Sequence, residues 1–242
     1  MPGAFGAELM VAPGVDYICI DQQHGLIDYP EMLNMLRAVE GRGAVPFTRV
    51  PANESWMFGK ALDAGVQGVI VPLVNSGADA RKAVAACRYG TAGTRSYGPI
   101  RAAMAMNSRD IAVLGDEVLC FAMVETREGL AKLDEIVSTP GLDGIYIGPA
   151  DLALGLGLSP DLDKSEPEHV AAVDSILAAC QRHGLVPGIQ CGSGLAARRQ
   201  VERGFRFVTF AKDSALVTSG LGRELDAALG DSATQSRDGG YV

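Results

Sequence analysis

Short apolar runs alternate with longer Ala- and Leu-rich segments along most of the chain, and this alternation is the strongest constraint on its fold. The runs are rich in β-branched or aromatic residues and are apolar on both faces, as is typical of parallel strands covered on both sides. The segments between them have helical spacing, so the pattern predicts a parallel sheet with right-handed crossovers. The predicted strands are residues 17–21, 45–50, 68–73, 118–125, 144–148, 186–190 and 205–210.

A (β/α)8 TIM-type barrel is the predicted fold, because 242 residues fit one large α/β barrel. Only seven strands are evident, and the eighth would have to precede residue 12. Residues 1–14 hold at most a stub of a strand and a short helix, so the first strand is expected to be short or missing. We expect one barrel domain over residues 1–230 and a flexible, polar, Gly-rich tail over residues 231–242.

An open doubly wound sheet is the competing architecture. Such sheets usually carry a Gly-rich phosphate loop after the first strand, and none follows Asp21. Residues 90–116 form a longer insertion between strands, and long ordered loops are often functional or form subunit contacts.

The composition excludes several classes of protein. The net charge is −8 with no basic cluster, which argues against a nucleic-acid partner. No apolar run reaches the roughly 18 residues needed to span a bilayer, and the N-terminus lacks the pattern of a signal peptide. The five cysteines form no CxxC pair, so buried reduced thiols in a cytoplasmic protein are expected.

Polar residues follow one predicted strand after another. In a barrel of this type, the carboxyl ends of the strands and the loops after them build the active site. A shared location at strand ends is difficult to explain by packing alone. These residues are Asp21, Gln23, His24, Arg49, Glu125, Asp151 and Gln190.

Glu125 and Asp151 are the predicted metal ligands, because both are hard oxygen donors at the ends of neighbouring strands. Two carboxylates, completed by substrate oxygens and water, suit Mg²⁺ or Mn²⁺. The alternatives are structural: Glu125 as an acid in the first turn of a helix, and Asp151 as the N-cap of a short helix.

Arg49 is the predicted partner of an anionic or enolate oxygen, because its planar fork offers several donors and stays charged. His24 is the candidate general base. A salt bridge at the barrel mouth and an exposed histidine are the respective alternatives. His169 and His183 lie in a polar helical stretch and are expected at the surface.

Other chemistries fit less well. Zinc would require a His or Cys cluster, which the sequence lacks. A Schiff base requires a buried lysine, and Lys212 is the only lysine at a strand end.

Four segments resemble the HpcH/HpaI class II pyruvate aldolases. They occur in the family's order and at similar spacing, and the resemblance runs from about residue 7 to residue 225. The segments are IDQQHG at 20–25, TRVP at 48–51, VETREGL at 124–130 and GPADLALGLG at 148–157.

This resemblance implies a barrel of the phosphoenolpyruvate/pyruvate type, a homo-oligomer built from dimers, often hexameric, and Mg²⁺, Mn²⁺ or Co²⁺ on Glu125 and Asp151. It implies that Arg49 stabilises the enolate oxygen. His24 and Asp63 would correspond to the family's acid–base dyad, with Asp63 acting across a subunit contact. Pyruvate would bind to the metal and to the turn formed by Gly148, Pro149, Ala150 and Asp151.

The chain departs from the family in two places. Gln23 stands where the family usually has an acidic residue. Gln23 and Asp21 are expected to lie around the metal ligands, so the loss of this charge would affect the surroundings of the metal. The family's first strand, which normally supplies an aromatic residue to the pocket, has no clear counterpart.

The resemblance implies cleavage of 4-hydroxy-2-oxo acids, such as 4-hydroxy-2-oxoheptanedioate or 2-keto-3-deoxy sugar acids, to pyruvate and an aldehyde. Two alternatives stay open: a CoA-thioester lyase of the citryl- or malyl-CoA type, and a non-catalytic barrel that binds a keto acid.

Overall fold

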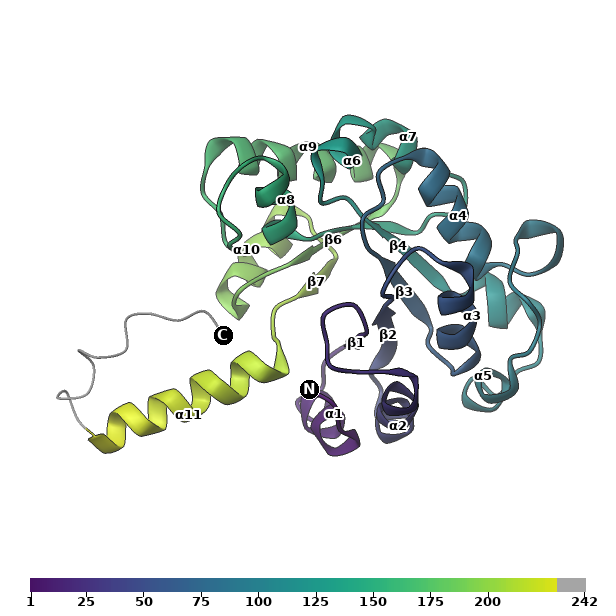
Figure 1. The fold of residues 1–242 in the computed structure, drawn as a ribbon, viewed down its shortest axis with the longest axis horizontal. Helices are drawn as coiled ribbons and strands as arrows, with labels where there is room; N and C mark the ends of the chain where they lie inside the picture. The colour runs from purple at the N-terminus through teal and green to yellow at the C-terminus, as the bar shows by residue number, and fades with distance from the viewer. Residues whose placement is uncertain (230–242) are drawn as a thin grey trace. The chain divides into compact units, whose positions relative to one another are not determined.

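Seven parallel strands form one sheet in the computed structural model, which describes residues 1–229 (Figure 1). Strands that are neighbours in sequence are neighbours in the sheet, in the order β1 to β7. The seven predicted strands are therefore confirmed, each within two residues at either end. The strands are β1 Tyr17–Asp21, β2 Val45–Arg49, β3 Gly68–Val71, β4 Leu119–Met123, β5 Gly144–Ile147, β6 Val186–Gln190 and β7 Phe207–Thr209.

Helices connect the strands, and two short helical segments lie in the insertion before β4. They are the 3-10 helix η1 Gly90–Ala92 and the π-helix η2 Ala112–Asp116. The helices are α1 Ala4–Val11, α2 Tyr29–Val39, α3 Ser55–Asp63, α4 Gly77–Cys87, α5 Ile100–Ala105, α6 Arg127–Ala131, α7 Leu133–Val137, α8 Pro149–Gly155, α9 Pro167–His183, α10 Gly194–Arg203 and α11 Asp213–Leu229.

Local sequence signals begin and end these helices. Asp28 caps α2 by accepting a hydrogen bond from the backbone N–H of Glu31, and Ser193 caps α10 in the same way. Gly184 and Gly204 end α9 and α10 in the left-handed conformation, where a side chain would be strained. These joints turn the chain from each helix into the next strand.

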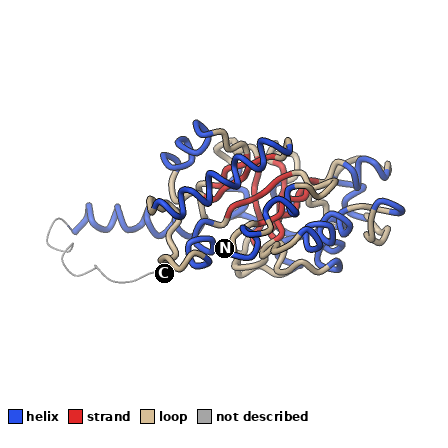
Figure 2. The backbone as a smooth tube through the Cα atoms, turned by 90° about the horizontal axis from the view of Figure 1, so that it is seen from above, coloured by secondary structure: helices blue, strands red, loops and turns tan. Residues whose placement is uncertain are grey.

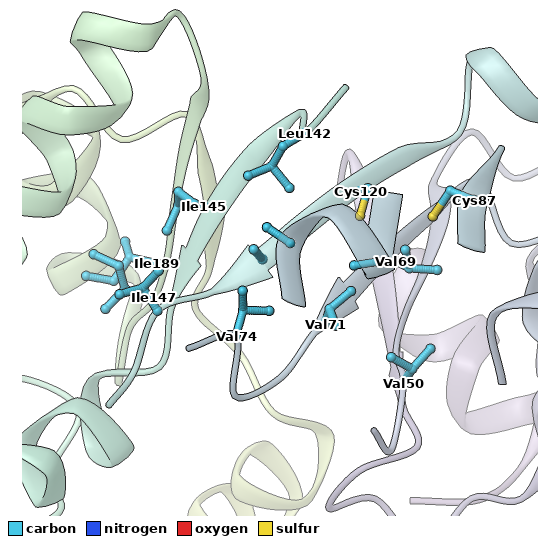
Figure 3. Close-up of a cluster of buried hydrophobic side chains, with 14 of the residues drawn as sticks. Val50, Val69, Val71, Val74, Cys87, Cys120, Leu142, Ile145, Ile147 and Ile189 are labelled. Carbon is cyan, nitrogen blue, oxygen red and sulfur yellow. The ribbon is translucent and has the colours of Figure 1, made fainter. Parts of the chain in front are cut away.

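Alternation along the strands produces two separate apolar layers. Val69 and Val71 point to the helix side, where they join the main core with Cys87 and Cys120 (Figure 3). Ile70, between them, points to the other face of the sheet. Viewed from above, helices surround the strands (Figure 2). The sheet is therefore covered by helices on its outer face, as the doubly apolar strands predict.

The inner face of the sheet is filled by apolar side chains, most of them aromatic. This inner cluster consists of Phe47, Ile70, Phe121, Met123, Tyr146 and Phe207, with Tyr17 and Cys19 packed against it. The rings of Tyr17 and Phe207 stack with their centroids 4.2 Å apart. The hydroxyl of Tyr17 also lies 2.6 Å from Oγ1 of Thr209. Since these residues belong to β1 and β7, the sheet curls until its first and last strands face each other.

The curled sheet is a half-barrel of seven strands, and the full (β/α)8 barrel is not confirmed. Among the described residues, β1 and β7 are not paired with each other, and no strand precedes β1. The N-terminal segment instead forms helix α1, which packs against α2 (Figure 1). The expected short helix is thus present. The barrel stays unclosed because side chains, rather than an eighth strand, join its two edges.

The chain divides into two compact units, residues 1–210 and a second unit that begins at Ala211 and contains α11. All residues that form the sheet and the predicted site belong to the first unit. A single domain through residue 230 stays a prediction, and the predicted tail at 231–242 lies outside the described residues.

Candidate active site

The carboxyl edge of the sheet collects most of the predicted site residues. Asp21 and Arg49 are the last residues of β1 and β2, and they are direct neighbours in the strand register. Glu125 follows β4, and Asp151 lies in the first turn of α8, directly after β5. Because all strands are parallel, these ends lie at one edge of the sheet.

Arg49 and Asp21 form a two-point ion pair. Nε of Arg49 donates to Oδ1 of Asp21 at 2.9 Å, and Nη2 donates to Oδ2 at 2.5 Å. Burial alone would raise the pKa of Asp21, but the hydrogen bonds and charge of Arg49 hold this pKa below its usual range. The pair fixes the guanidinium plane and leaves Nη1 without a partner among the described residues. A fixed cation with one nitrogen, Nη1, free to donate suits an oxygen that gains negative charge.

Glu125 is buried, with only 2% of its surface exposed. Its Oε1 accepts a hydrogen bond from the backbone N–H of Leu73 at 2.9 Å, whereas Oε2 has no partner among the described residues. Burial, reinforced by the nearby charge of Asp151, raises the pKa of Glu125 to about 7. A buried carboxylate oxygen without a partner is unfavourable unless a cation or proton occupies it.

Gly148 makes room for this oxygen. A Cβ at position 148 would overlap Oε2 of Glu125, so a side chain there would displace the carboxylate. Gly148 is also the N-cap of α8, the helix whose first turn carries Asp151. The lack of a side chain at this residue therefore leaves space for the Glu125 carboxylate directly before the helix that carries Asp151.

The donor set fits a hard divalent cation. Glu125 and Asp151 interact electrostatically, and no third His, Cys, Asp or Glu joins them within residues 1–229. Two carboxylate ligands leave coordination positions for substrate oxygens and water, which is how Mg²⁺ and Mn²⁺ are commonly held. The partnerless Oε2 of Glu125 is the structural feature that supports this assignment most directly.

His169 holds the turn that carries Asp151. Nε2 of His169 lies 3.1 Å from the carbonyl oxygen of Pro149, and the side chain is buried at 3% exposure. Its expected position at the surface is therefore wrong, whereas His183 is exposed as expected. The polar sequence around His169 gave no signal of this contact, because its partner lies 20 residues away.

His24 and Gln23 lie in the loop after β1. His24 is exposed, and its backbone N–H and that of Gln23 both donate to Oδ1 of Asp21. The side-chain oxygen of Gln23 is buried without a partner among the described residues. This loop is therefore anchored by the carboxylate that also holds Arg49.

The structure does not bring Asp63 to this edge within one chain. Asp63 ends α3, directly before β3, so it lies at the opposite edge of the sheet. Its Oδ1 accepts a hydrogen bond at 3.0 Å from Nη2 of the buried Arg95, which comes from the insertion before β4. Asp63 also lines a surface hollow of about 600 Å³. A role for Asp63 as the partner of His24 would therefore require a second copy of the chain.

Comparison with known proteins gives the family. The sequence profile of the HpcH/HpaI aldolase/citrate lyase family matches residues 6–219, and the chain belongs to this family. It is 42% identical to a hydroxypyruvate/pyruvate aldolase of Rhizorhabdus wittichii, over 90% of this chain and 87% of that protein. It is 31% identical to a 4-hydroxy-2-oxo-heptane-1,7-dioate aldolase of Salmonella paratyphi A, over 91% of this chain and 84% of that protein.

A solved structure agrees with the sequence relatives. The crystal structure of an HpcH/HpaI aldolase/citrate lyase family protein from Burkholderia cenocepacia superposes with a TM-score of 0.87 at 30% identity. The match covers 94% of this chain and 91% of that chain. The chain is thus a carbon–carbon lyase of the aldolase type. This confirms the predicted enzyme class and disagrees with the alternative of a non-catalytic keto-acid-binding barrel.

Within residues 1–229, none of the helices is long and apolar enough to cross a membrane.

Proposed function

We propose that the protein is a divalent-metal-dependent aldolase that cleaves 4-hydroxy-2-oxo acids to pyruvate and an aldehyde and catalyses the reverse addition. The observation that carries this proposal is the buried, partnerless Oε2 of Glu125 beside Asp151. The free Nη1 of Arg49 supports it, since Arg49 lies close enough to Glu125 for its positive charge to lower the pKa of this carboxyl group. The aldolases among its relatives point to the same reaction class.

Glu125 and Asp151 would hold Mg²⁺, Mn²⁺ or Co²⁺. The bound ion would supply a positive charge that polarises the 2-oxo group of the substrate. The turn formed by Gly148, Pro149 and Ala150 would lie against the substrate carboxylate, as the family resemblance implies.

Cleavage needs a base and a stabilised enolate. A base removes the proton of the 4-hydroxyl group, the C3–C4 bond breaks, and its electron pair passes to the 2-oxo group as an enolate. The aldehyde leaves, and a proton added at C3 converts the enolate to pyruvate. Arg49 donates to the enolate oxygen through Nη1, where a preorganised charge lowers the barrier most.

His24 is the proposed base, because its exposed ring lies in the loop beside Asp21. Asp63 would assist it only from a neighbouring copy of the chain, since within one chain it lies at the other edge of the sheet. A homo-oligomer is therefore part of the proposal. Its keto-acid and aldehyde substrates are small molecules, and a cytoplasmic location stays a prediction.

Pyruvate release tests the proposal. Protein stripped with EDTA would be assayed with 4-hydroxy-2-oxoheptanedioate and a 2-keto-3-deoxy sugar acid, before and after addition of Mg²⁺, Mn²⁺ or Co²⁺. We expect release only after metal addition. Equal release in EDTA would contradict metal dependence, whereas cleavage of citryl- or malyl-CoA in place of these acids would favour the thioester lyase.

A further inference from the structure

Leu73 is an exposed apolar residue at the carboxyl edge of the sheet. It follows β3 and is 54% exposed, although Pro72 and Val74 on either side are buried. Strand β3 lies between β2, which ends in Arg49, and β4, which leads to Glu125. An apolar side chain is therefore held in solvent between the strands of two predicted site residues.

The backbone of Leu73 has an unfavourable conformation for this residue type. Its φ is 54°, in the left-handed region, and only Leu73 and Asn107 among the described non-glycine residues have a positive φ. Glycine or asparagine would adopt this conformation more readily than leucine. Strained backbone of this kind concentrates at functional sites, where surrounding contacts hold it in place.

Two hydrogen bonds donated by backbone N–H groups hold Leu73 in this conformation. Its own N–H donates to Oε1 of Glu125 at 2.9 Å, and the N–H of Val74 donates to the carbonyl of Met123 at 3.1 Å. On the side of residues 73 and 74, these bonds require only the backbone. They explain the position of residue 73 beside Glu125, but they do not explain why its side chain is that of leucine.

We propose that Leu73 is a specificity-determining residue whose side chain forms the apolar wall that contacts the substituent of the aldehyde. This inference rests on the proposed function and adds the chemical class of its second substrate, an aldehyde with an apolar substituent. In the free protein, leucine at position 73 carries both backbone strain and exposed apolar surface. Burial of this surface against an apolar substituent would offset both, whereas a small polar aldehyde would gain nothing from it.

Aldol addition with two aldehydes tests the inference. Pyruvate and Mn²⁺ would be combined with either glycolaldehyde, which is small and polar, or pentanal, which is apolar. We expect L73A to lower kcat/KM for pentanal about tenfold relative to glycolaldehyde, in the range that loss of apolar pocket contacts costs. L73N suits the left-handed backbone but is polar, so it should show the same loss. L73M, which keeps the apolar bulk, should stay near the wild type.

The control is Leu119→Ala. Leu119 is also an exposed leucine, but it begins β4 at the opposite edge of the sheet, so this variant should not change the ratio of the two kcat/KM values. An unchanged ratio in L73A, or no product from pentanal with the wild type, would overturn the inference.

Deuterium exchange of the pyruvate methyl protons, measured without aldehyde, distinguishes failure of the inference about Leu73 from failure of the proposed function. Metal-dependent exchange in the wild type with an unchanged ratio in L73A overturns the inference alone. Lack of exchange in the wild type overturns the proposed function, and the inference falls with it.

Discussion

A methyl group on Gly148 would overlap Oε2 of Glu125, the buried oxygen that has no partner within the described part of the chain. Glycine at this position is therefore part of the proposed metal site, although it has no side chain to bind a ligand. Its backbone φ is negative, so the requirement for glycine comes from space and not from conformation.

Gly148→Ala should weaken metal binding. The added methyl group must displace the Glu125 carboxylate, so we expect the Kd for Mn²⁺ to rise at least about tenfold, as for changes next to metal ligands. Calorimetric titration with Mn²⁺ measures the change. Gly194→Ala is the matched control, because Gly194 begins α10 after β6 and nothing lies within 4 Å of its added Cβ. Equal Kd values in both variants would contradict the overlap.

Glu125→Gln should change how the stability of the metal-free protein depends on pH. The pKa of Glu125 is raised from 4.5 to about 7, so between these pH values the folded state holds a proton that the unfolded state releases. The wild type should therefore lose stability as pH rises through this window, by up to about 3 kcal/mol. The variant lacks this loss. Urea unfolding in EDTA near pH 5 and pH 8 gives the free energy of unfolding of both proteins. We expect the value of the variant minus that of the wild type to be larger at pH 8 than at pH 5, and an equal difference at both pH values would contradict the assignment.

Replacements of His169 should separate a donor from a space-filling role. The substitution His169→Gln keeps a side-chain donor for the carbonyl of Pro149, whereas His169→Leu removes it. We expect H169L to lose about 1–2 kcal/mol of stability and to bind Mn²⁺ several-fold more weakly, because the turn that carries Asp151 loses its support. H169Q should recover most of both. If H169Q binds Mn²⁺ as weakly as H169L, the hydrogen bond does not position Asp151.

Arg49→Lys keeps the positive charge but removes the two-point pair with Asp21. Lysine cannot hold Asp21 and also present a directed donor to the enolate. We expect kcat to fall about a hundredfold or more, in line with removal of one donor from an oxyanion site. Steady-state kinetics and urea unfolding of the same variant measure the two effects. If the free energy of unfolding falls by more than the activation free energy rises, a purely structural salt bridge would be favoured.

The strands could be predicted because their signal is local. Runs such as β3 and β5 are apolar on both faces and begin with glycine, so they can be recognised without knowledge of their neighbours. The curl of the sheet, which leaves the barrel unclosed, could not be predicted in this way. It depends on contacts between Tyr17 and Phe207, which are far apart in the sequence.

The location of a candidate site residue could be predicted where it depends only on a strand end, whereas the roles of these residues stay predictions. Arg49 ends β2, Glu125 follows β4 and Asp151 follows β5, and the parallel topology brings these strand ends to one edge. The burial of His169 and the left-handed backbone of Leu73 depend on partners distant in sequence, so the sequence carried no signal for them. A catalytic role for Asp63 was predicted only from the family resemblance, and within one chain the fold places this residue at the amino edge of the sheet.

Mn²⁺ binding, followed together with turnover, tests the central claim most directly. Free Mn²⁺ would be measured by electron paramagnetic resonance while EDTA-stripped protein is titrated, and pyruvate release would be assayed in the same samples. We predict that turnover of the wild type rises in proportion to bound Mn²⁺, and that both binding and turnover are lost in Glu125→Ala and in Asp151→Ala. Unchanged Mn²⁺ affinity in Glu125→Ala, or full turnover before any Mn²⁺ is bound, would contradict the account.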